Sequence, residues 1–419
     1  MTEAQSSTSQ QQTLFALSYF SNLSAMQMGV NLEGVTYARI QEALEKAKPT
    51  IGAWRIVWGP SVIQLHSAFF AVNTMYVAQS VDDPTQYVIA IAGTNPYSAY
   101  DWLFEDCLVG AQVPWIYAQN APDAKIALGT ASGFSTLLRM TPSGDRPGAG
   151  TTLKHFLKTI TGTKVSVAVA GHSLGGVLAP TVALWLRDMQ GLLHPLHWDR
   201  HMRATVSCFS TAGPTAGNSA FATHSYQRFG TKLDRIVNPL DVVPCAWNQT
   251  TLATLKTIYA PAIAADQFVD VLVELGLRMS KNGDYAALQA SAPIQAAVNP
   301  AFISPDRTVL ANYLVQAGHQ HEGAYINWAR FDRGWLPTDA ARAEGSALAT
   351  LAQPVCRAFM AAGLPAPFEI SALRTAERHR LIPVGLVAYE APHSAGDPEM
   401  QQIVADLKAE MERDAASAD

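Results

Sequence analysis

A serine at position 173 lies in a context that could make it a nucleophile. It is the central residue of Gly171-His-Ser-Leu-Gly175, and a β-branched apolar run beginning at Val165 leads into this motif. An apolar stretch with helical spacing follows, so the pattern predicts a strand, a sharp turn and a helix. Such a turn lifts the serine hydroxyl above the end of a sheet, although a Gly/Ser turn without chemistry is the alternative.

A serine hydroxyl is a weak nucleophile, and it needs a histidine as base and a carboxylate that orients the histidine. The preferred carboxylate is that of Asp241, because a strand runs into it from Arg235 and Pro244 follows it. Side chains just past the carboxyl end of a strand lie in the crevice where open α/β sheets bind ligands. Asp234 precedes the strand and is the poorer candidate, and a turn-capping role is the alternative for Asp241.

Four histidines follow this aspartate and are candidates for the base, namely His319, His321, His379 and His393. His321 is preferred and His319 comes second, because both lie in a compact polar loop that enters a helix. A histidine there can reach over the edge of a sheet. His379 stands among charged residues in a solvated stretch, and His393 lies in a Pro/Gly turn.

The tetrahedral intermediate of acyl transfer needs two backbone N–H donors. One is expected from Leu174, which follows the serine at a helix N-terminus whose dipole favours negative charge. The other is expected from Thr94, at the end of the apolar run Tyr87–Gly93. A plain strand-ending Gly-Thr turn is the alternative for Thr94.

The elements that must position these residues alternate between strand and helix patterns. This alternation predicts an α/β fold with a mostly parallel central sheet and helices on both faces. Besides the strand before Ser173, strands are expected over 67–78, 86–92, 204–210 and 233–238, and helices over 13–28, 34–47, 151–160 and 175–190, with a further helical stretch beginning at 102.

The second half of the chain departs from this alternation. Residues 250–316 are rich in Ala and Leu, read as helical without a strand, and are expected to form an insertion before the histidine. This insertion is expected either to cap the site or to form a peripheral pair of helices. The expected organisation is therefore one α/β domain over 1–330 and a C-terminal extension over 331–419 packed on it. The extension ends in a helix over 397–413.

The composition restricts the classes of partner. Of 419 residues, 15% are charged and 48% are hydrophobic, and the formal net charge is −5. The negative charge argues against nucleic acid or an anionic membrane as an electrostatic partner. The low fraction of charged residues fits a protein that presents apolar surface. Transient contact with a lipid interface is therefore expected. No metal or organic cofactor is implied.

No transmembrane segment is expected. Residues 165–186 carry no charge and are long enough to span a bilayer, but three glycines and Pro180 interrupt them, and the strand–turn–helix pattern explains each glycine. The polar N-terminus is not a secretory signal, so a cytoplasmic location or export without a classical signal peptide is expected. The four cysteines lack the spacing of a metal site and are expected to be buried free thiols. A single disulfide is the alternative.

Several motifs, taken in order, resemble the class 3 (fungal-type) lipase family. The resemblance covers about residues 14–328, and its histidine segment is similar to that of bacterial-type members. The motifs that carry it are Ala92-Gly-Thr with Asp101-Trp102, Thr130-Ala-Ser-Gly-Phe134, Gly171-His-Ser-Leu-Gly-Gly176, residues 211–221, Val237-Asn-Pro-Leu-Asp-Val-Val-Pro244 and Gln320-His321-x-x-x-Tyr325. Ala92, Ser132 and Thr215-Ala216 depart from the family pattern, and altered loop packing is expected there.

The resemblance implies an α/β-hydrolase fold and a serine carboxylester hydrolase of the lipase or esterase type, acting on lipid-like acyl esters. It carries Ser173, Asp241 and His321 over as the catalytic triad, and Thr94 and Leu174 as the oxyanion hole. A phospholipase or acyltransferase using the same triad is the alternative within enzymes. A non-catalytic binding module and a toxin delivered into neighbouring cells are further alternatives.

Overall fold

The computed structural model of the chain describes residues 8–23, 31–64, 71–93, 109–118, 120–191, 197–291 and 293–337. The expected C-terminal helix over 397–413, nearly all of the extension over 331–419 and the expected helical stretch from Trp102 lie outside these residues.

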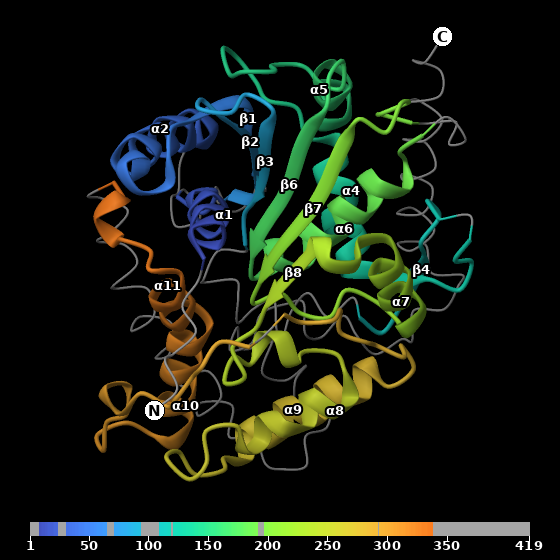
Figure 1. Ribbon diagram of the computed structural model, residues 1–419. Helices are drawn as coiled ribbons and strands as arrows, with labels where there is room; N and C mark the ends of the chain where they lie inside the picture. The colour runs from blue at the N-terminus through green and yellow to red at the C-terminus, as the bar shows by residue number, and fades with distance from the viewer. Residues whose placement is uncertain are drawn as a thin grey trace.

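A six-stranded sheet organises the described part of the chain (Figure 1). Its order is β1-β2-β3-β6-β7-β8; the two pairs among β1, β2 and β3 are antiparallel, and the three pairs from β3 to β8 are parallel. The mostly parallel sheet of an α/β fold is thus confirmed. The strands are Trp54–Gln64 (β1), Ala71–Ser80 (β2), Gln86–Ile91 (β3), Val165–His172 (β6), Ala204–Thr211 (β7) and Leu233–Ile236 (β8).

Strand β1 was not predicted from the sequence. It contains the pair Gly59-Pro60, which is typical of a turn. The strand accommodates this pair through irregularities in its register with β2, between Ile56 and Trp58 and between Trp58 and Ser61. A second, two-stranded sheet pairs Gln112–Pro114 (β4) with Lys125–Ala127 (β5).

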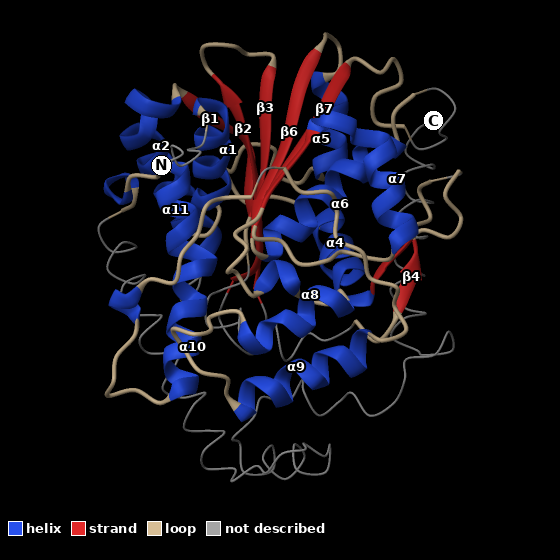
Figure 2. Ribbon diagram, turned by 60° about the horizontal axis from the view of Figure 1, so that its bottom comes forward, coloured by secondary structure: helices blue, strands red, loops and turns tan. Residues whose placement is uncertain are grey.

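Helices cover both faces of the central sheet (Figures 1 and 2). One face packs on Leu128–Arg139 (α4), Leu153–Ile160 (α5), Leu174–Asp188 (α6) and Ser219–Phe229 (α7), and the other on Ser9–Phe20 (α1), Leu32–Ile51 (α2) and Ala324–Ala329 (α11). Because both faces are covered, the inner strands are apolar almost throughout, as expected for parallel sheets.

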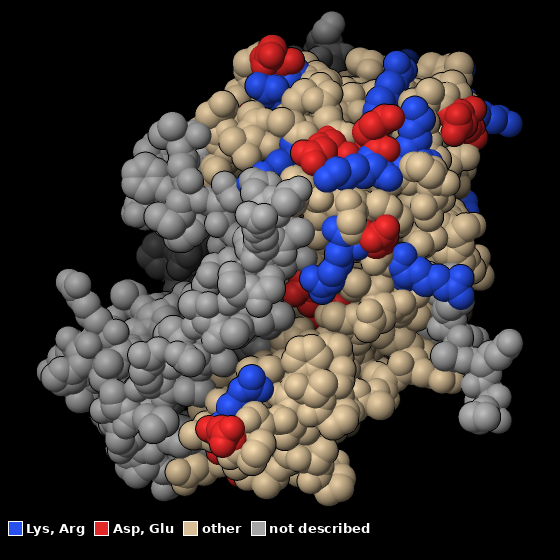
Figure 3. All heavy atoms as spheres, turned by 90° about the vertical axis from the view of Figure 1, so that its left-hand side faces the viewer, with Lys and Arg blue, Asp and Glu red and all other residues tan. Residues whose placement is uncertain are grey.

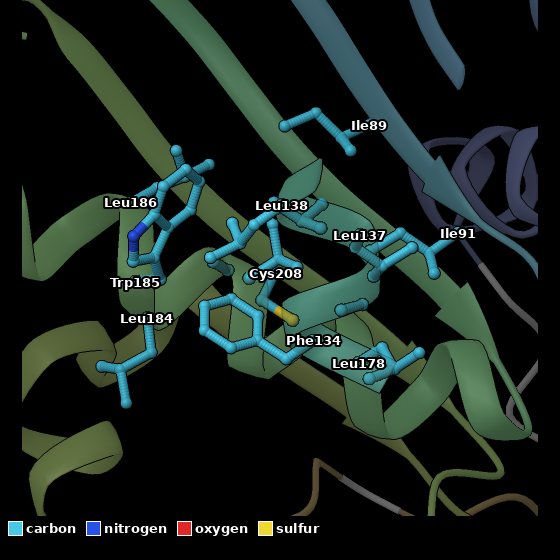
Figure 4. Close-up of a cluster of buried hydrophobic side chains, with 14 of the residues drawn as sticks. Ile89, Ile91, Phe134, Leu137, Leu138, Leu178, Leu184, Trp185, Leu186 and Cys208 are labelled. Atoms are coloured by element: carbon cyan, nitrogen blue, oxygen red, sulfur yellow. The ribbon is translucent and has the colours of Figure 1, made fainter. Parts of the chain in front are cut away.

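Alternate side chains of each strand belong to different cores, as the two-residue period of a strand requires. In β3, Ile89 and Ile91 pack with α4 and α6, whereas Val88 and Ala90 pack with α1 and α2. Figure 4 shows the first of these cores, in which Phe134 of α4 and Cys208 of β7 lie among leucines of both helices. Cys208 is a buried free thiol and Cys245 a partly buried one, while the other two cysteines lie outside the described residues.

Helices and irregular stretches alternate over the segment 250–316, and the longest irregular stretch lies between Ser280 and Pro300. Its helices are Gln267–Ser280 (α9) and Val309–Gly318 (α10), and α8 (Gln249–Ala253) leads into it. In Figures 1 and 2, α8, α9 and α10 lie beyond the ends of the strands where β6 and β8 finish. Among the described residues, no helix has the length and apolar character needed to cross a bilayer.

Charged side chains of both signs are mixed on the face shown in Figure 3. Helix α2 carries two ion pairs, Glu42 with Lys46 at 2.7 Å and Glu45 with Lys48 at 3.6 Å. The described residues on this face therefore do not form the single-sign patch that a polyanion would need.

The turn between β6 and α6 is held by contacts that leave no room for side chains. A Cβ atom on Gly171 would lie 2.0 Å from the carbonyl oxygen of Gly175, and one on Gly175 would lie 2.2 Å from that of Ile91. Only glycine fits at these positions. The start of α6 is thus packed directly on the ends of β6 and β3.

Replacement of Gly175 by alanine should lower the free energy of unfolding by about 2 kcal/mol or more, because the new methyl group must push backbone apart. Urea unfolding measures this change. Gly162 is the matched control, because a Cβ there meets nothing within 4 Å, and Gly162→Ala should change stability by less than about 0.5 kcal/mol. Equal effects of the two substitutions would contradict the tight packing of the turn.

Candidate active site

Ser173 lies where the sequence pattern predicted it, between the last residue of β6 and the first residue of α6. Its backbone has φ 61° and ψ −123°, a conformation that costs a non-glycine residue free energy. The tight turn and the hydrogen bond from its backbone N–H to the carbonyl oxygen of Thr211, at 3.0 Å, hold it there. The side chain thereby projects from the carboxyl end of the strand, although only 7% of the residue is exposed.

The structure brings Ser173 together with both preferred downstream candidates. The Nε2 atom of His321 lies 2.8 Å from the Oγ atom of Ser173. The Nδ1 atom of the same ring lies 3.0 Å and 3.1 Å from the two carboxylate oxygens of Asp241, which is fully buried. A carboxylate can only accept hydrogen bonds, so it holds the ring proton of His321 on Nδ1. The Nε2 atom is then free to accept the proton of the Ser173 hydroxyl.

His321 does not lie in a loop, and that expectation was wrong. Residues His319–Gly323 form a π-helical turn that joins α10 to α11, with the backbone N–H of Ala324 bonded to the carbonyl oxygen of His319. The polar residues of this stretch and the glycines on either side, Gly318 and Gly323, are typical of a loop, but the backbone here continues the helix with hydrogen bonds that span five residues. Such π-turns occur frequently at functional sites. Figure 1 shows α10 and α11 nearly in line.

Further hydrogen bonds hold the carboxylate of Asp241 and the loop that carries it in place. The hydroxyl of Tyr325 donates to Oδ2 of Asp241 at 3.1 Å and accepts the backbone N–H of Asn238 at 2.8 Å. The side-chain amide of Asn238 donates to both the backbone and the side-chain oxygen of Gln320, at 2.8 Å each. The loop that carries the acid is therefore tied to the turn that carries the histidine.

Neither role had been predicted, although Tyr325 was part of the motif that resembles the family. The signal was its spacing, because a residue four positions after His321 lies on the same face of a helix. Burial and the charge of Asp241 raise the pKa of the Tyr325 hydroxyl well above its ordinary value. The hydroxyl therefore remains protonated and donates to the carboxylate at physiological pH.

The other candidates lie elsewhere. The ring of His319 stacks on Phe302, with centroids 4.2 Å apart, and its half-buried position lowers its pKa. The carboxylate of Asp234 instead accepts hydrogen bonds from the side chains of Gln11 and Ser291. His379 and His393 lie outside the described residues.

The two expected amide donors have different outcomes. Leu174 is the first residue of α6, so its N–H points from the positive end of a helix dipole beside Ser173. Thr94 lies outside the described residues. The preceding Gly93 lies against the site, because a Cβ on it would stand 3.1 Å from the Cβ of Ser173. The chain thus reaches the site one residue before Thr94, and the role of Thr94 stays a prediction.

The charges around His321 determine its protonation. Burial lowers its pKa, but the charge and hydrogen bond of Asp241 and the charge of Glu322 outweigh burial, so the pKa lies above 6.5. His172 packs against this ring with centroids 5.1 Å apart, and its Nδ1 atom lies 2.9 Å from the hydroxyl of Thr211. Burial and the neighbouring His321 hold the pKa of His172 well below 6.5, so it presents a neutral ring.

Comparison with known proteins agrees with this architecture. The family model for class 3 lipases matches residues 88–250. M37 lipase, whose crystal structure is known, is 32% identical and superposes with a TM-score of 0.71, over 82% of this chain and 98% of that one. This chain belongs to the class 3 lipase family and has the α/β-hydrolase fold of its lipase relatives.

A curated relative is more distant. Phospholipase A1 EG1, a chloroplastic/mitochondrial protein of Oryza sativa subsp. indica, is 28% identical in an alignment of 227 residues that covers 49% of this chain. The match spans 48% of that protein, so this chain corresponds to about half the length of the relative.

Activity should fall as the pH decreases through the raised pKa of His321, because only the neutral imidazole can accept a proton from Ser173. The acid limb of kcat/KM is expected to have its midpoint above pH 6.5. Glu322→Gln removes one of the charges that raise this pKa and should move the midpoint to lower pH. An acid limb that lies below pH 6.5, or that Glu322→Gln moves upward, would contradict the assignment.

Tyr325→Phe should lower kcat by about tenfold with little change in KM, because Asp241 loses a hydrogen bond and the Asn238 N–H loses its acceptor. Steady-state kinetics with a soluble ester measures this. The matched control is Tyr285→Phe, which removes a buried hydrogen bond of 2.7 Å to the carbonyl oxygen of Val109 away from the site. If the two variants lost equal amounts of kcat, the tyrosine at 325 would be a structural residue only.

Proposed function

We propose that this protein is a serine carboxylester hydrolase that cleaves lipid-like acyl esters. The observation that carries the proposal is the position of the His321 ring, within hydrogen-bond distance of both the Ser173 hydroxyl and the Asp241 carboxylate. Membership of the class 3 lipase family and the likeness to M37 lipase support the choice of an ester of lipid type.

In the proposed reaction, Oγ of Ser173 attacks the ester carbonyl carbon while Nε2 of His321 takes the hydroxyl proton. Asp241 holds the ring in the required tautomer and stabilises the imidazolium that forms. The oxyanion accepts the N–H of Leu174 and, as we propose, that of Thr94. The intermediate collapses when His321 passes its proton to the leaving alcohol, and water then cleaves the acyl-enzyme by the same steps in reverse.

The setting of the site suits an apolar ester. The helices beyond the strand ends have their own buried apolar cluster, which includes Val242 and Val243 directly after Asp241. With 15% charged residues, the chain offers little electrostatic attraction for a charged substrate. We infer transient contact with a lipid surface, which a rise in rate above the solubility limit of the ester would support.

The relationship to phospholipase A1 EG1 makes a phospholipid the second candidate substrate. Both candidates use the same hydrolysis of a carboxylic ester. Parallel assays with triacylglycerol and with phosphatidylcholine in the same detergent separate them, and the better substrate is the one with the larger kcat/KM.

Ser173→Ala should reduce hydrolysis of p-nitrophenyl butyrate by at least about a thousandfold and abolish labelling by a fluorophosphonate probe. Ser225→Ala is the matched control, because Ser225 is a buried serine on α7 whose hydroxyl donates to the carbonyl oxygen of Phe221. Its activity and labelling should match those of the unmodified protein. A wild-type protein that neither labels nor hydrolyses any ester would instead indicate a binding module.

A further inference from the structure

One buried titratable side chain at the site takes no part in the proposed reaction. His172 is the last residue of β6 and directly precedes Ser173, and only 5% of it is exposed. Because side chains alternate along a strand, its ring points to the same face of the sheet as Ala170, the face that α1 and α11 cover. Burying a polar ring in this apolar layer costs free energy unless the ring gains hydrogen bonds there.

The hydrogen bonds of the His172 ring join two segments of the site. Its Nδ1 atom lies 2.9 Å from the hydroxyl of Thr211, the last residue of β7. The carbonyl oxygen of the same threonine accepts the backbone N–H of Ser173 at 3.0 Å. A second hydrogen bond joins the His172 ring to the backbone of His321. The ring therefore connects the segment around the nucleophile to the π-turn that carries the base.

The same ring also packs against the base. The rings of His172 and His321 have their centroids 5.1 Å apart, and their planes are inclined by 35°. The rings of Tyr325 and Phe15 meet the His172 ring edge-on, with centroids at 5.3 Å and 5.8 Å. Side chains from α1 and α11 thus enclose the His172 ring, and the enclosed ring in turn restricts the motion of His321.

The charge of His172 matters because His321 becomes an imidazolium during the proposed reaction. Two cationic rings this close would repel each other strongly in a buried site. Burial and the neighbouring His321 hold the pKa of His172 well below 6.5, so its ring stays neutral. The other ionisable groups packed around the pair are Tyr325 from α11, Asp241 and Glu322 beside His321, and Tyr19 from α1, whose hydroxyl donates to Glu322.

We propose that His172 is a positioning residue, a neutral bridge that holds the ring of His321 against the Ser173 hydroxyl. The inference rests on the proposed function and adds a residue that belongs neither to the triad nor to the oxyanion hole. Hydrogen bonds of Tyr325 and Asn238 tie the base to the acid loop, whereas His172 ties the base to the nucleophile. The distance of 2.8 Å between Nε2 of His321 and Oγ of Ser173 is therefore held from both sides.

Three substitutions at position 172 separate the contributions of the ring. Phenylalanine keeps an aromatic ring without hydrogen bonds, whereas the amides of glutamine and asparagine lie near the positions of Nε2 and Nδ1. With a soluble ester, His172→Phe should lower kcat by about tenfold or more and change KM by less than about twofold, because the base loses its alignment while the binding surface is kept. His172→Gln keeps a hydrogen bond toward His321 and should recover more of the lost kcat than His172→Asn.

The matched control is His224→Gln. His224 is a second buried histidine, on α7 at the other face of the sheet, and its Nε2 atom lies 2.9 Å from the carboxylate of Asp188. Fluorophosphonate labelling counts the reactive serines, so kcat is compared per labelled site, and this variant should keep the kcat of the unmodified protein. The acid limb of kcat/KM should not move to higher pH in His172→Phe, because the ring that is removed carries no charge to repel His321.

Two kinetic results would overturn the proposal. One is an unchanged kcat per labelled site in His172→Phe, and the other is an acid limb that this substitution moves to higher pH. Should His172→Phe fail to fold by circular dichroism, the other two variants decide, and equal kcat values in His172→Gln, His172→Asn and the unmodified protein would have the same consequence.

A spectroscopic measurement separates this proposal from the catalytic one. The Nδ1 proton of His321, bonded to the buried carboxylate of Asp241, should give a low-field proton NMR signal whether or not any ester is turned over. The signal should persist in His224→Gln and weaken in His172→Phe, because the proton of a ring that is no longer held exchanges faster with water. A signal that His172→Phe leaves unchanged counts against the positioning role alone. An unmodified protein that gives the signal but hydrolyses no ester counts against the proposed function.

Discussion

The site depends on one stretch of backbone that only close packing can hold. Ser173 has a conformation that is unfavourable for a residue with a side chain, and it persists because β6, β3 and α6 meet there through glycines. The serine is thereby fixed at the end of a central strand and at the start of a helix. Every other feature of the site is arranged around this fixed point.

The acid and the histidine must reach that point from distant parts of the chain. Asp241 follows the last strand of the sheet, and 80 positions separate it from His321, with α8, α9 and α10 between them. The chain is brought back by hydrogen bonds rather than by a strand. Asn238, Gln320 and Tyr325 join the acid loop to the π-turn, so these two segments form a unit facing Ser173.

The features predicted correctly from the sequence are those that depend on local pattern. The turn at Ser173 has apolar strand and helix patterns on either side, and Asp241 follows a strand expected over 233–238, so both could be placed. The contacts of Tyr325 and Asn238 depend on how distant segments meet, which spacing alone does not show. Strand β1 and the π-turn at His321 were not predicted, because Gly-Pro pairs and clustered polar residues are more typical of turns and loops.

Trapping of the acyl-enzyme tests the central claim most directly. The protein is mixed with p-nitrophenyl butyrate, quenched in acid within the first turnover and digested, and the peptides are analysed by mass spectrometry. We expect a butyryl group on the peptide that contains Ser173, and no such adduct in a sample quenched after all ester is consumed. A butyryl group on a different residue, or turnover without any acylated peptide, would contradict the account.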